Sequence, residues 1–354
     1  MLDKVQKIIN DSNLDIVVFS DPVHLLWFAG FSGSTGVLLV SDSGAVLGVD
    51  FRYHEIAEDL KVENLDVYCA PTGNLLKNTL DYFFKKKVER VGYLASRNSQ
   101  NQKESLQKVL NAELVAIDHE INFARSQKNK SEIVGLVESS KLNADLFNHI
   151  REMVKPGISE RDLAAEIISY AVKKGASKMA FDPIVASGKN ASRPHASFTD
   201  KILEPGEPLT LDLGVCLDGW SSDMTRTWVV PGKKPTEGLL KIFDIVNSAK
   251  KEAESHLAVG ASGHDLDASA RDVIKKFGYG DFFGHSLGHG IGREVHEEPR
   301  LAQNSKDIML DGMAVTIEPG IYIKDKHGVR IEDSYLIVDK NVINLGIDVF
   351  SDFF

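Results

Sequence analysis

Residues 209–230 read LTLDLGVCLDGWSSDMTRTWVV, two apolar runs that each carry one internal aspartate. The pattern predicts a β-hairpin that turns at Asp218-Gly219, with Asp212 and Asp223 in its two strands. Because side chains alternate between the faces of a strand, a turn centred there places both aspartates on one face as diagonal neighbours. A turn one residue earlier places them directly opposite each other. Either register brings the two carboxylates together.

Residues 313–335 repeat this arrangement and read MAVTIEPGIYIKDKHGVRIEDSY. Their internal acids are Glu318 and Glu332, and a polar loop centred on residue 325 sets these two opposite each other on one face. The neighbours that point to the other face are apolar. Four carboxylates are therefore expected to project from the interiors of strands whose opposite faces are buried.

A single acid on a half-solvated strand is explained by simple exposure to water, but four acids in two similar hairpins are harder to explain in that way. Like charges across a ladder are destabilising, and partly buried carboxylates must protonate, pair or bind a metal. Ion pairs with Arg226 and Arg330 are the structural alternative, whereas a bound metal accounts for more of the pattern. The stretch GHSLGHGIG, residues 284–292, adds His289 between glycines that permit close backbone approach.

The 354-residue length predicts two domains, which we place at residues 1–124 and 125–354 on either side of a polar stretch at 121–130. The first reads as a small α/β domain. In the second, an order of helix, helix, irregular stretch and hairpin occurs twice. The predicted helices cover residues 131–154, 159–174, 237–257 and 264–277, and the irregular stretches cover residues 181–199 and 278–295. This mixture predicts an α+β fold class.

The composition narrows the possible partners and location. The chain has 41 basic and 51 acidic residues, a net charge of −10 that argues against a nucleic-acid partner. No apolar run approaches the ~20 residues that cross a bilayer, and the first residues lack a signal-peptide core. Two cysteines in a chain of this length favour a reducing compartment. We therefore expect a cytoplasmic protein with no membrane partner.

The acids and the histidine together resemble the five-ligand signature of the pita-bread metallopeptidases, which include methionine aminopeptidase, aminopeptidase P and prolidase. The matching positions are Asp212, Asp223, His289 in Gly-His-Gly, Glu318 in Thr-Ile-Glu-Pro-Gly and Glu332 in Arg-Ile-Glu-Asp. The resemblance runs from about residue 125 to the end and implies a pita-bread (creatinase/aminopeptidase) fold there. The N-terminal domain resembles the creatinase-like domain of the proline-specific branch, and its FAGFSGSTG at 28–36 and DFRY at 50–53 are closer to aminopeptidase P than to prolidase.

The resemblance implies hydrolysis of the bond between an N-terminal residue and a following proline, by attack of a hydroxide that bridges two divalent metal ions. An oxygen-rich ligand set favours Mn²⁺, with Co²⁺ as a substitute and Zn²⁺ as a further possibility. Glu318 is expected to be both a ligand and the proton shuttle, and His296 and His195 are expected to donate hydrogen bonds in catalysis. These two histidines, with Arg300 and Arg330, are the expected substrate-binding residues. The family also implies a homodimer and peptide substrates with proline in the second position.

Three alternatives stay open at this point. The first is an Xaa-Pro dipeptidase (prolidase) restricted to dipeptides, and the second is metal-free creatine amidinohydrolysis on the same fold, whose enzymes lack the carboxylate ligands. The third is a non-enzymatic binding protein on this fold, which typically loses ligands and gains basic tails. The native metal, the preferred first residue and the substrate length do not follow from the sequence.

Overall fold

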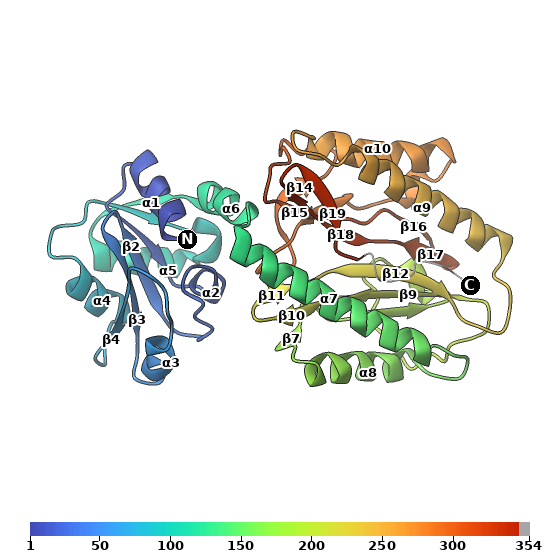
Figure 1. Ribbon diagram of the computed structural model, residues 1–354, viewed down its shortest axis with the longest axis horizontal. Coiled ribbons are helices and arrows are strands. Elements are labelled where there is room, and N and C mark those ends of the chain that lie inside the picture. Colours follow the sequence, from blue (N-terminus) through green and yellow to red (C-terminus); the bar gives the residue numbers. More distant parts are fainter. Residues whose placement is uncertain (347–354) are drawn as a thin grey trace. The chain divides into compact units, whose positions relative to one another are not determined.

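The computed structural model describes residues 1–346 (Figure 1). The chain divides into two compact units, Met1–Ala124 and Arg125–Phe354. No helix within residues 1–346 has the length and apolar character needed to cross a membrane.

The first unit is built on a mixed six-stranded sheet of order β4-β3-β2-β1-β5-β6. Its strands are β1 (Ile16–Phe19), β2 (Val37–Ser41), β3 (Gly44–Val49), β4 (Leu65–Cys69), β5 (Arg90–Tyr93) and β6 (Glu113–Ala116). Its helices are α1 (Leu2–Asp11), α2 (Pro22–Ala29), α3 (His54–Glu58), α4 (Leu75–Phe83), α5 (Gln100–Leu110) and, crossing into the second unit, α6 (Asp118–Ser126). Alternate strand residues enter two separate apolar clusters, so both faces of this sheet are buried.

The described part of the second unit, residues 125–346, has four long helices, α7 (Lys130–Met153), α8 (Glu160–Lys173), α9 (Glu237–His256) and α10 (Gly263–Lys276). Their predicted positions are confirmed to within a few residues. A capping box begins α8, because the Ser159 side chain accepts from the Asp162 backbone N–H while the Asp162 side chain accepts from the Ser159 backbone N–H.

The strands of the second unit form four small antiparallel sheets, of orders β11-β10-β7, β12-β9-β8, β14-β13-β15-β18-β19 and β16-β17. The strands of the first half are β7 (Lys178–Met179), β8 (Ile184–Ser187), β9 (Pro208–Leu213), β10 (Val215–Leu217), β11 (Trp220–Ser221) and β12 (Met224–Val229). Those of the second half are β13 (Gly288–Gly290), β14 (Glu297–Leu301), β15 (Ala314–Ile317), β16 (Gly320–Ile323), β17 (His327–Arg330), β18 (Asp333–Val338) and β19 (Asn341–Asn344).

Two helix pairs cover these sheets on opposite sides (Figure 1). One apolar cluster joins α7 and α8 to β9 and β12, and another joins α9 and α10 to β15, β17 and β18. The apolar faces of the two hairpins therefore pack against the helices, and their polar faces lie towards each other between the two halves of this unit.

The expectation of uninterrupted strands with the acids in their interiors is wrong for three of the four carboxylates. Asp223 lies between β11 and β12, Glu318 between β15 and β16, and Glu332 between β17 and β18. At each of these points the chain leaves one sheet and enters the next. A break in the ladder frees backbone and side chain from regular pleating, which lets carboxylates on several segments aim at one point.

Two further differences concern the stretches predicted to be irregular. Residues 181–199 contain β8, and residues 278–295 contain β13. The strands β8 and β13 are only 4 and 3 residues long, and strands this short carry too little periodicity to be recognised in a single sequence.

Candidate metal centre

The first hairpin turns at Asp218-Gly219, as one of the two predicted registers required. Met224 pairs with Leu213 and Thr225 with Asp212, while Cys216 pairs with Ser221 beyond the break. Asp212 and Asp223 are therefore diagonal neighbours across the two strands.

The second hairpin places Glu318 opposite Glu332. The pairs on either side of them, Ile317 with Asp333 and Gly320 with Arg330, belong to one continuous register across the break. The two glutamates are thus aligned by the loop centred on residue 325, although neither belongs to a strand.

His289 is the central residue of β13, where two glycines are sterically required. A Cβ atom on Gly288 would lie 2.0 Å from the Thr316 carbonyl oxygen, and one on Gly290 would lie 2.1 Å from that of Glu298. The backbone of His289 is consequently packed between two neighbouring segments at a distance that only glycine allows. Its ring Nδ1 lies 3.1 Å from the Gly290 carbonyl oxygen, so a proton on Nδ1 leaves the Nε2 lone pair for a metal.

The five predicted ligands converge on one buried point. His289 Nε2 lies 3.4 Å from Glu318 Oε1 and 3.7 Å from Asp223 Oδ2. One ligand atom each from Asp223, His289 and Glu332 lie within 4.8 Å of one another. Asp212 closes the cluster from β9, where it faces Thr225, which in turn donates to Glu332 at 2.6 Å.

This cluster holds more carboxylates than cations, because only His289 and Arg330 form ion pairs with its four acids within residues 1–346. Burial raises the pKa of both Asp223 and Glu332 well above the ordinary carboxyl value, and the charges of the neighbouring carboxylates raise it further. Burial also acts to raise the pKa of Glu318, but the hydrogen bond and charge of His289 lower it below its usual value.

Three buried carboxylate oxygens test whether these residues fit a metal. Asp212 Oδ1, Asp223 Oδ1 and Glu332 Oε1 have no hydrogen-bond partner among residues 1–346. A buried oxygen without a partner costs free energy, so such atoms are uncommon in a folded protein unless an ion binds them. Four carboxylates and one imidazole are a hard, oxygen-rich donor set, and we conclude that they fit divalent cations.

Arg330 braces the cluster from β17, and its side chain is buried. Nη2 donates to Asp212 Oδ2 at 2.6 Å and Nε donates to Thr225 Oγ1 at 3.1 Å. Nη1 donates to the Tyr322 hydroxyl at 2.8 Å and to the Pro194 carbonyl at 3.2 Å. The guanidinium therefore neutralises one carboxylate, and within residues 1–346 no arginine or lysine forms an ion pair with Asp223, Glu318 or Glu332.

The remaining predicted residues surround the cluster. His296 is exposed, and its ring lies edge-on to His289 with centroids 4.4 Å apart. His195 is exposed on the loop whose Pro194 carbonyl binds Arg330. Partial desolvation of the imidazole ring, and then the charges of His289 and His195, lower the pKa of His296.

Arg300 lies opposite His289 across β13 and β14, so both side chains project from the same face. Its side chain is exposed and lines a cavity of about 710 Å³. His285 and Lys306 also line this cavity, and His285 Nε2 lies 2.9 Å from the Tyr322 hydroxyl that binds Arg330.

Sequence reasoning missed three residues that hold the site together. Thr225 and Tyr322 connect Arg330 to Glu332 and His285, as described above. Glu297, which follows His296, is buried between Arg125 Nη2 at 2.6 Å and Lys128 Nζ at 3.0 Å. Thr225 alone had a usable signal, because the predicted register already placed it opposite Asp212.

Comparison with known proteins identifies the family. Residues 135–339 match the model of metallopeptidase family M24, and residues 1–127 match the creatinase/prolidase N-terminal domain. The chain is 34% identical over 347 residues to the Xaa-Pro dipeptidase of Pyrococcus furiosus, covering 97% of each chain. It is 31% identical to a putative Xaa-Pro aminopeptidase of Mycoplasma pneumoniae, over 98% of this chain and 96% of the other.

A solved structure agrees with these matches. The Xaa-Pro dipeptidase from Bacillus anthracis superposes with a TM-score of 0.91 at 32% identity, over 98% of this chain and 96% of that one. The predicted fold class, a pita-bread domain preceded by a creatinase-like domain, is confirmed. The chain therefore belongs to metallopeptidase family M24, which uses divalent metal ions.

Proposed function

We propose that this protein hydrolyses the bond between an N-terminal residue and a following proline, as an aminopeptidase of the aminopeptidase P type. The observation that carries the proposal is the buried cluster of four carboxylates and one imidazole, three of whose oxygens have no hydrogen-bond partner within residues 1–346. In this proposal two divalent ions are held by Asp212, Asp223, His289, Glu318 and Glu332.

Mn²⁺ is the metal that we propose, with Co²⁺ as a working substitute and Zn²⁺ as the competing possibility. The donor set contains no thiolate, since Cys69 is exposed in the first unit and Cys216 lies on β10. Oxygen-rich sites of this kind suit Mn²⁺ better than the metals that prefer sulfur. When bound, the ions supply Lewis-acid polarisation of a carbonyl group and lower the pKa of water.

We propose that Glu318 accepts the proton of the attacking water and transfers it. Its pKa is lowered by the hydrogen bond and charge of His289 against the opposing effect of burial, so the carboxylate is ionised near neutral pH and can accept a proton. Its side chain is also 17% exposed, more than that of Asp223 or His289, so it lies at the open side of the cluster. It would pass the proton to the leaving nitrogen of proline.

His296 and His195 are proposed to donate hydrogen bonds to the substrate carbonyl. Both side chains are exposed, and that of His296 packs beside His289, within reach of a peptide at the ligands. Arg330 holds Asp212 in place, and Arg300 is proposed to contact the peptide beyond the scissile bond. The pair of histidines thus orients the carbonyl while Glu318 handles the proton.

Substrate length separates this proposal from its main rival, an Xaa-Pro dipeptidase. Relatives carry both names, so the names do not decide between them. Arg300, the strand neighbour of His289, lines the 710 Å³ cavity, and we propose that this cavity receives the residues that follow the proline in an aminopeptidase substrate. A dipeptidase would instead close this side around the free carboxylate of proline.

The test is hydrolysis of a small panel of Xaa-Pro dipeptides and Xaa-Pro tripeptides by the full chain. Activity should disappear after chelation and return with Mn²⁺. Comparable or faster cleavage of the tripeptides supports the aminopeptidase, whereas cleavage of dipeptides alone supports the dipeptidase. An enzyme that cleaves neither series after Mn²⁺ is added contradicts the proposed function.

Two further expectations follow from the family resemblance and belong to the same proposal. We propose that the protein is a homodimer and that it acts in the cytoplasm, with no nucleic-acid or membrane partner. Light scattering of the purified chain tests the first expectation, and fractionation of cells that express it tests the second.

A further inference from the structure

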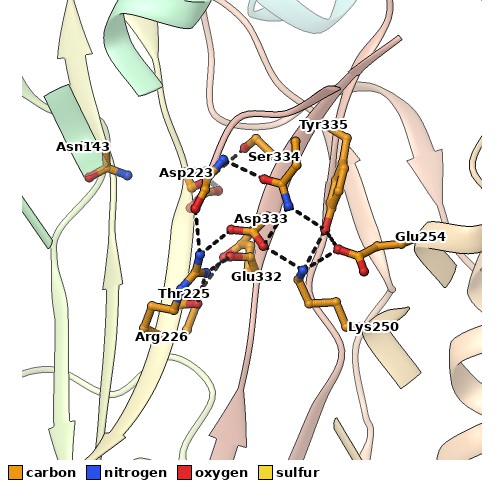
Figure 2. Close-up of polar contacts among 12 residues, drawn as sticks. Asn143, Asp223, Thr225, Arg226, Lys250, Glu254, Glu332, Asp333, Ser334 and Tyr335 are labelled. Carbon is orange, nitrogen blue, oxygen red and sulfur yellow. Dashed lines mark hydrogen bonds and ion pairs between the residues drawn. The ribbon is translucent and has the colours of Figure 1, made fainter. Parts of the chain in front are cut away.

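A second cluster of buried charges adjoins the ligand Glu332, because its member Asp333 is the next residue in the chain. It contains Arg226 of β12 and Asp333 of β18, together with Lys250 and Glu254 of α9 (Figure 2). The side chains of Arg226, Asp333 and Lys250 are 3%, 6% and 8% exposed, so these charges are largely removed from water.

Arg226 joins the two hairpins at the point where their ligands meet. Nη1 donates to the Thr225 carbonyl at 3.0 Å and to the Glu332 carbonyl at 2.5 Å. The same Thr225 carbonyl accepts from the Glu332 backbone N–H at 3.0 Å, in the isolated bridge between these two residues. One guanidinium therefore ties together the two backbone segments whose side chains, Thr225 and Glu332, bond to each other at 2.6 Å.

Asp333 holds this guanidinium in place. Its Oδ1 accepts from Arg226 Nη2 at 2.6 Å, and its Oδ2 lies 2.7 Å from Lys250 Nζ. The next residue, Ser334, donates its hydroxyl to the Asp223 carbonyl at 2.9 Å. The segment 332–334 thus contacts the first hairpin at three successive residues, and Asp223 is one of the groups that it holds (Figure 2).

The charges of this second cluster balance one another. Lys250 Nζ lies 2.6 Å from Glu254 Oε1 and 2.7 Å from the Tyr335 hydroxyl, which also bonds to Glu254. Two cations, Arg226 and Lys250, therefore face two carboxylates, Asp333 and Glu254. Arg226 is consequently not available to neutralise the ligand carboxylates, in contrast to Arg330, and its contact with that site is through backbone carbonyls.

We propose that Arg226, fixed by Asp333, is a positioning residue for the metal centre, which sets Glu332 on the second hairpin against Thr225 and Asp223 on the first. The inference rests on the proposed metal site. Metal ligands on separate segments bind an ion tightly only when their separation is preset, and groups that orient ligands without touching the ion influence affinity strongly. The planar fork of arginine suits this role because it donates to several oxygens in fixed directions, which the single ammonium of lysine cannot do.

The experiment compares Arg226→Lys and Asp333→Asn with the wild-type chain. Arg226→Lys retains the positive charge but loses the planar guanidinium group. Asp333→Asn retains the shape of the side chain but loses the negative charge that holds the Arg226 guanidinium in place. Ile274→Ala on α10 is the matched control. Ile274 is fully buried in the apolar cluster that joins α9 and α10 to the sheets, so this substitution lowers stability without altering a predicted metal ligand. For each metal-free protein, calorimetric titration gives the Mn²⁺ dissociation constant and urea unfolding gives the stability.

The two substitutions in the cluster are expected to raise the Mn²⁺ dissociation constant about 10- to 100-fold. Ile274→Ala should bind Mn²⁺ like the wild type even though its metal-free form is less stable. If Arg226→Lys does not fold, Asp333→Asn decides the question by the same two measurements.

Wild-type Mn²⁺ affinity in both cluster variants would overturn the inference, as would an equal loss of affinity in Ile274→Ala, since either result reduces Arg226 to a stabilising residue. Absence of Mn²⁺ binding by the wild-type chain would overturn the proposed function instead, so the two failures are distinguishable.

Discussion

Replacing Glu297 by glutamine is expected to destabilise the second unit by on the order of 3 kcal/mol at neutral pH, and the loss should vanish in acid. Burial opposes ionisation of Glu297, but Lys128 and Arg125 overcome it and lower its pKa from 4.5 to about 2. Lowering this pKa from 4.5 to about 2 corresponds to roughly 3 kcal/mol of folded-state stabilisation of the ionised carboxylate. The glutamate is buried, so solvent does not screen these contacts strongly.

The dependence on pH has a defined sign. Because the pKa is lower in the folded state, the ion pairs contribute their full stability above the unfolded value of 4.5. This contribution is lost as the pH falls towards 2. The difference in unfolding free energy between wild type and Glu297→Gln should therefore be largest at pH 7 and decrease between about pH 4.5 and pH 2.

Urea unfolding of the metal-free protein in chelator, at pH 7, 5 and 3, measures this difference without the pH dependence of metal binding. Tryptophan fluorescence reports on the second unit through Trp220 and Trp228, both of which are buried there. Glu298→Gln is the control, because the described part of the chain gives Glu298 no ion pair, and it should change little at any pH. A difference for Glu297→Gln that is below about 0.5 kcal/mol, or equal at all three pH values, would refute the reasoning.

Three further substitutions test the site itself. Asp223→Asn should stabilise the metal-free protein by on the order of 1 kcal/mol at pH 8, because burial and neighbouring acids raise the pKa of Asp223 and Glu332. In urea unfolding, this gain in stability should grow as the pH rises from the ordinary carboxyl range through the raised pKa, and a loss of stability would contradict the prediction. Glu318→Gln should lower turnover of an Xaa-Pro peptide by about 100-fold or more, and unchanged turnover would exclude the proton-transfer role. Glu160→Gln should lower the free energy of unfolding by about 1–3 kcal/mol, because the buried Glu160 carboxylate accepts hydrogen bonds at both ends of the loop that carries His195. The variant should also show a raised KM with little change in kcat, and unaltered stability would contradict this role of Glu160.

The registers of the two hairpins were predictable, to within one residue for the first hairpin, because they depend on local chemistry. The Asp218-Gly219 turn has both residues at positive φ, of 49° and 76°, as a two-residue hairpin turn requires. Once the turn is set, the partner of every strand residue follows from counting. The capping box that opens α8 was predictable for the same reason, since Ser159 and Asp162 are three residues apart.

The breaks in the strands were not predicted. The chain passes between the sheet of β15 and β18 and that of β16 and β17 at Glu318-Pro319 and at Ile331-Glu332. Pro319 was a usable signal at the first break, because proline has no backbone N–H to donate to a ladder. Ile331-Glu332 carries no such signal, and there only the packing of each sheet on its own neighbours shows that the ladder is interrupted.

The amino-acid sequence by itself determined which acids pair within each hairpin, since a short turn and a period of two leave few choices. Only the tertiary structure decided which cation meets which carboxylate: Arg330 binds Asp212, while Arg226 binds Asp333. These partners are more than 100 residues apart in the chain. The distance between such segments is determined by how the helix layers and sheets pack, and that packing depends on the whole apolar core rather than on any local pattern.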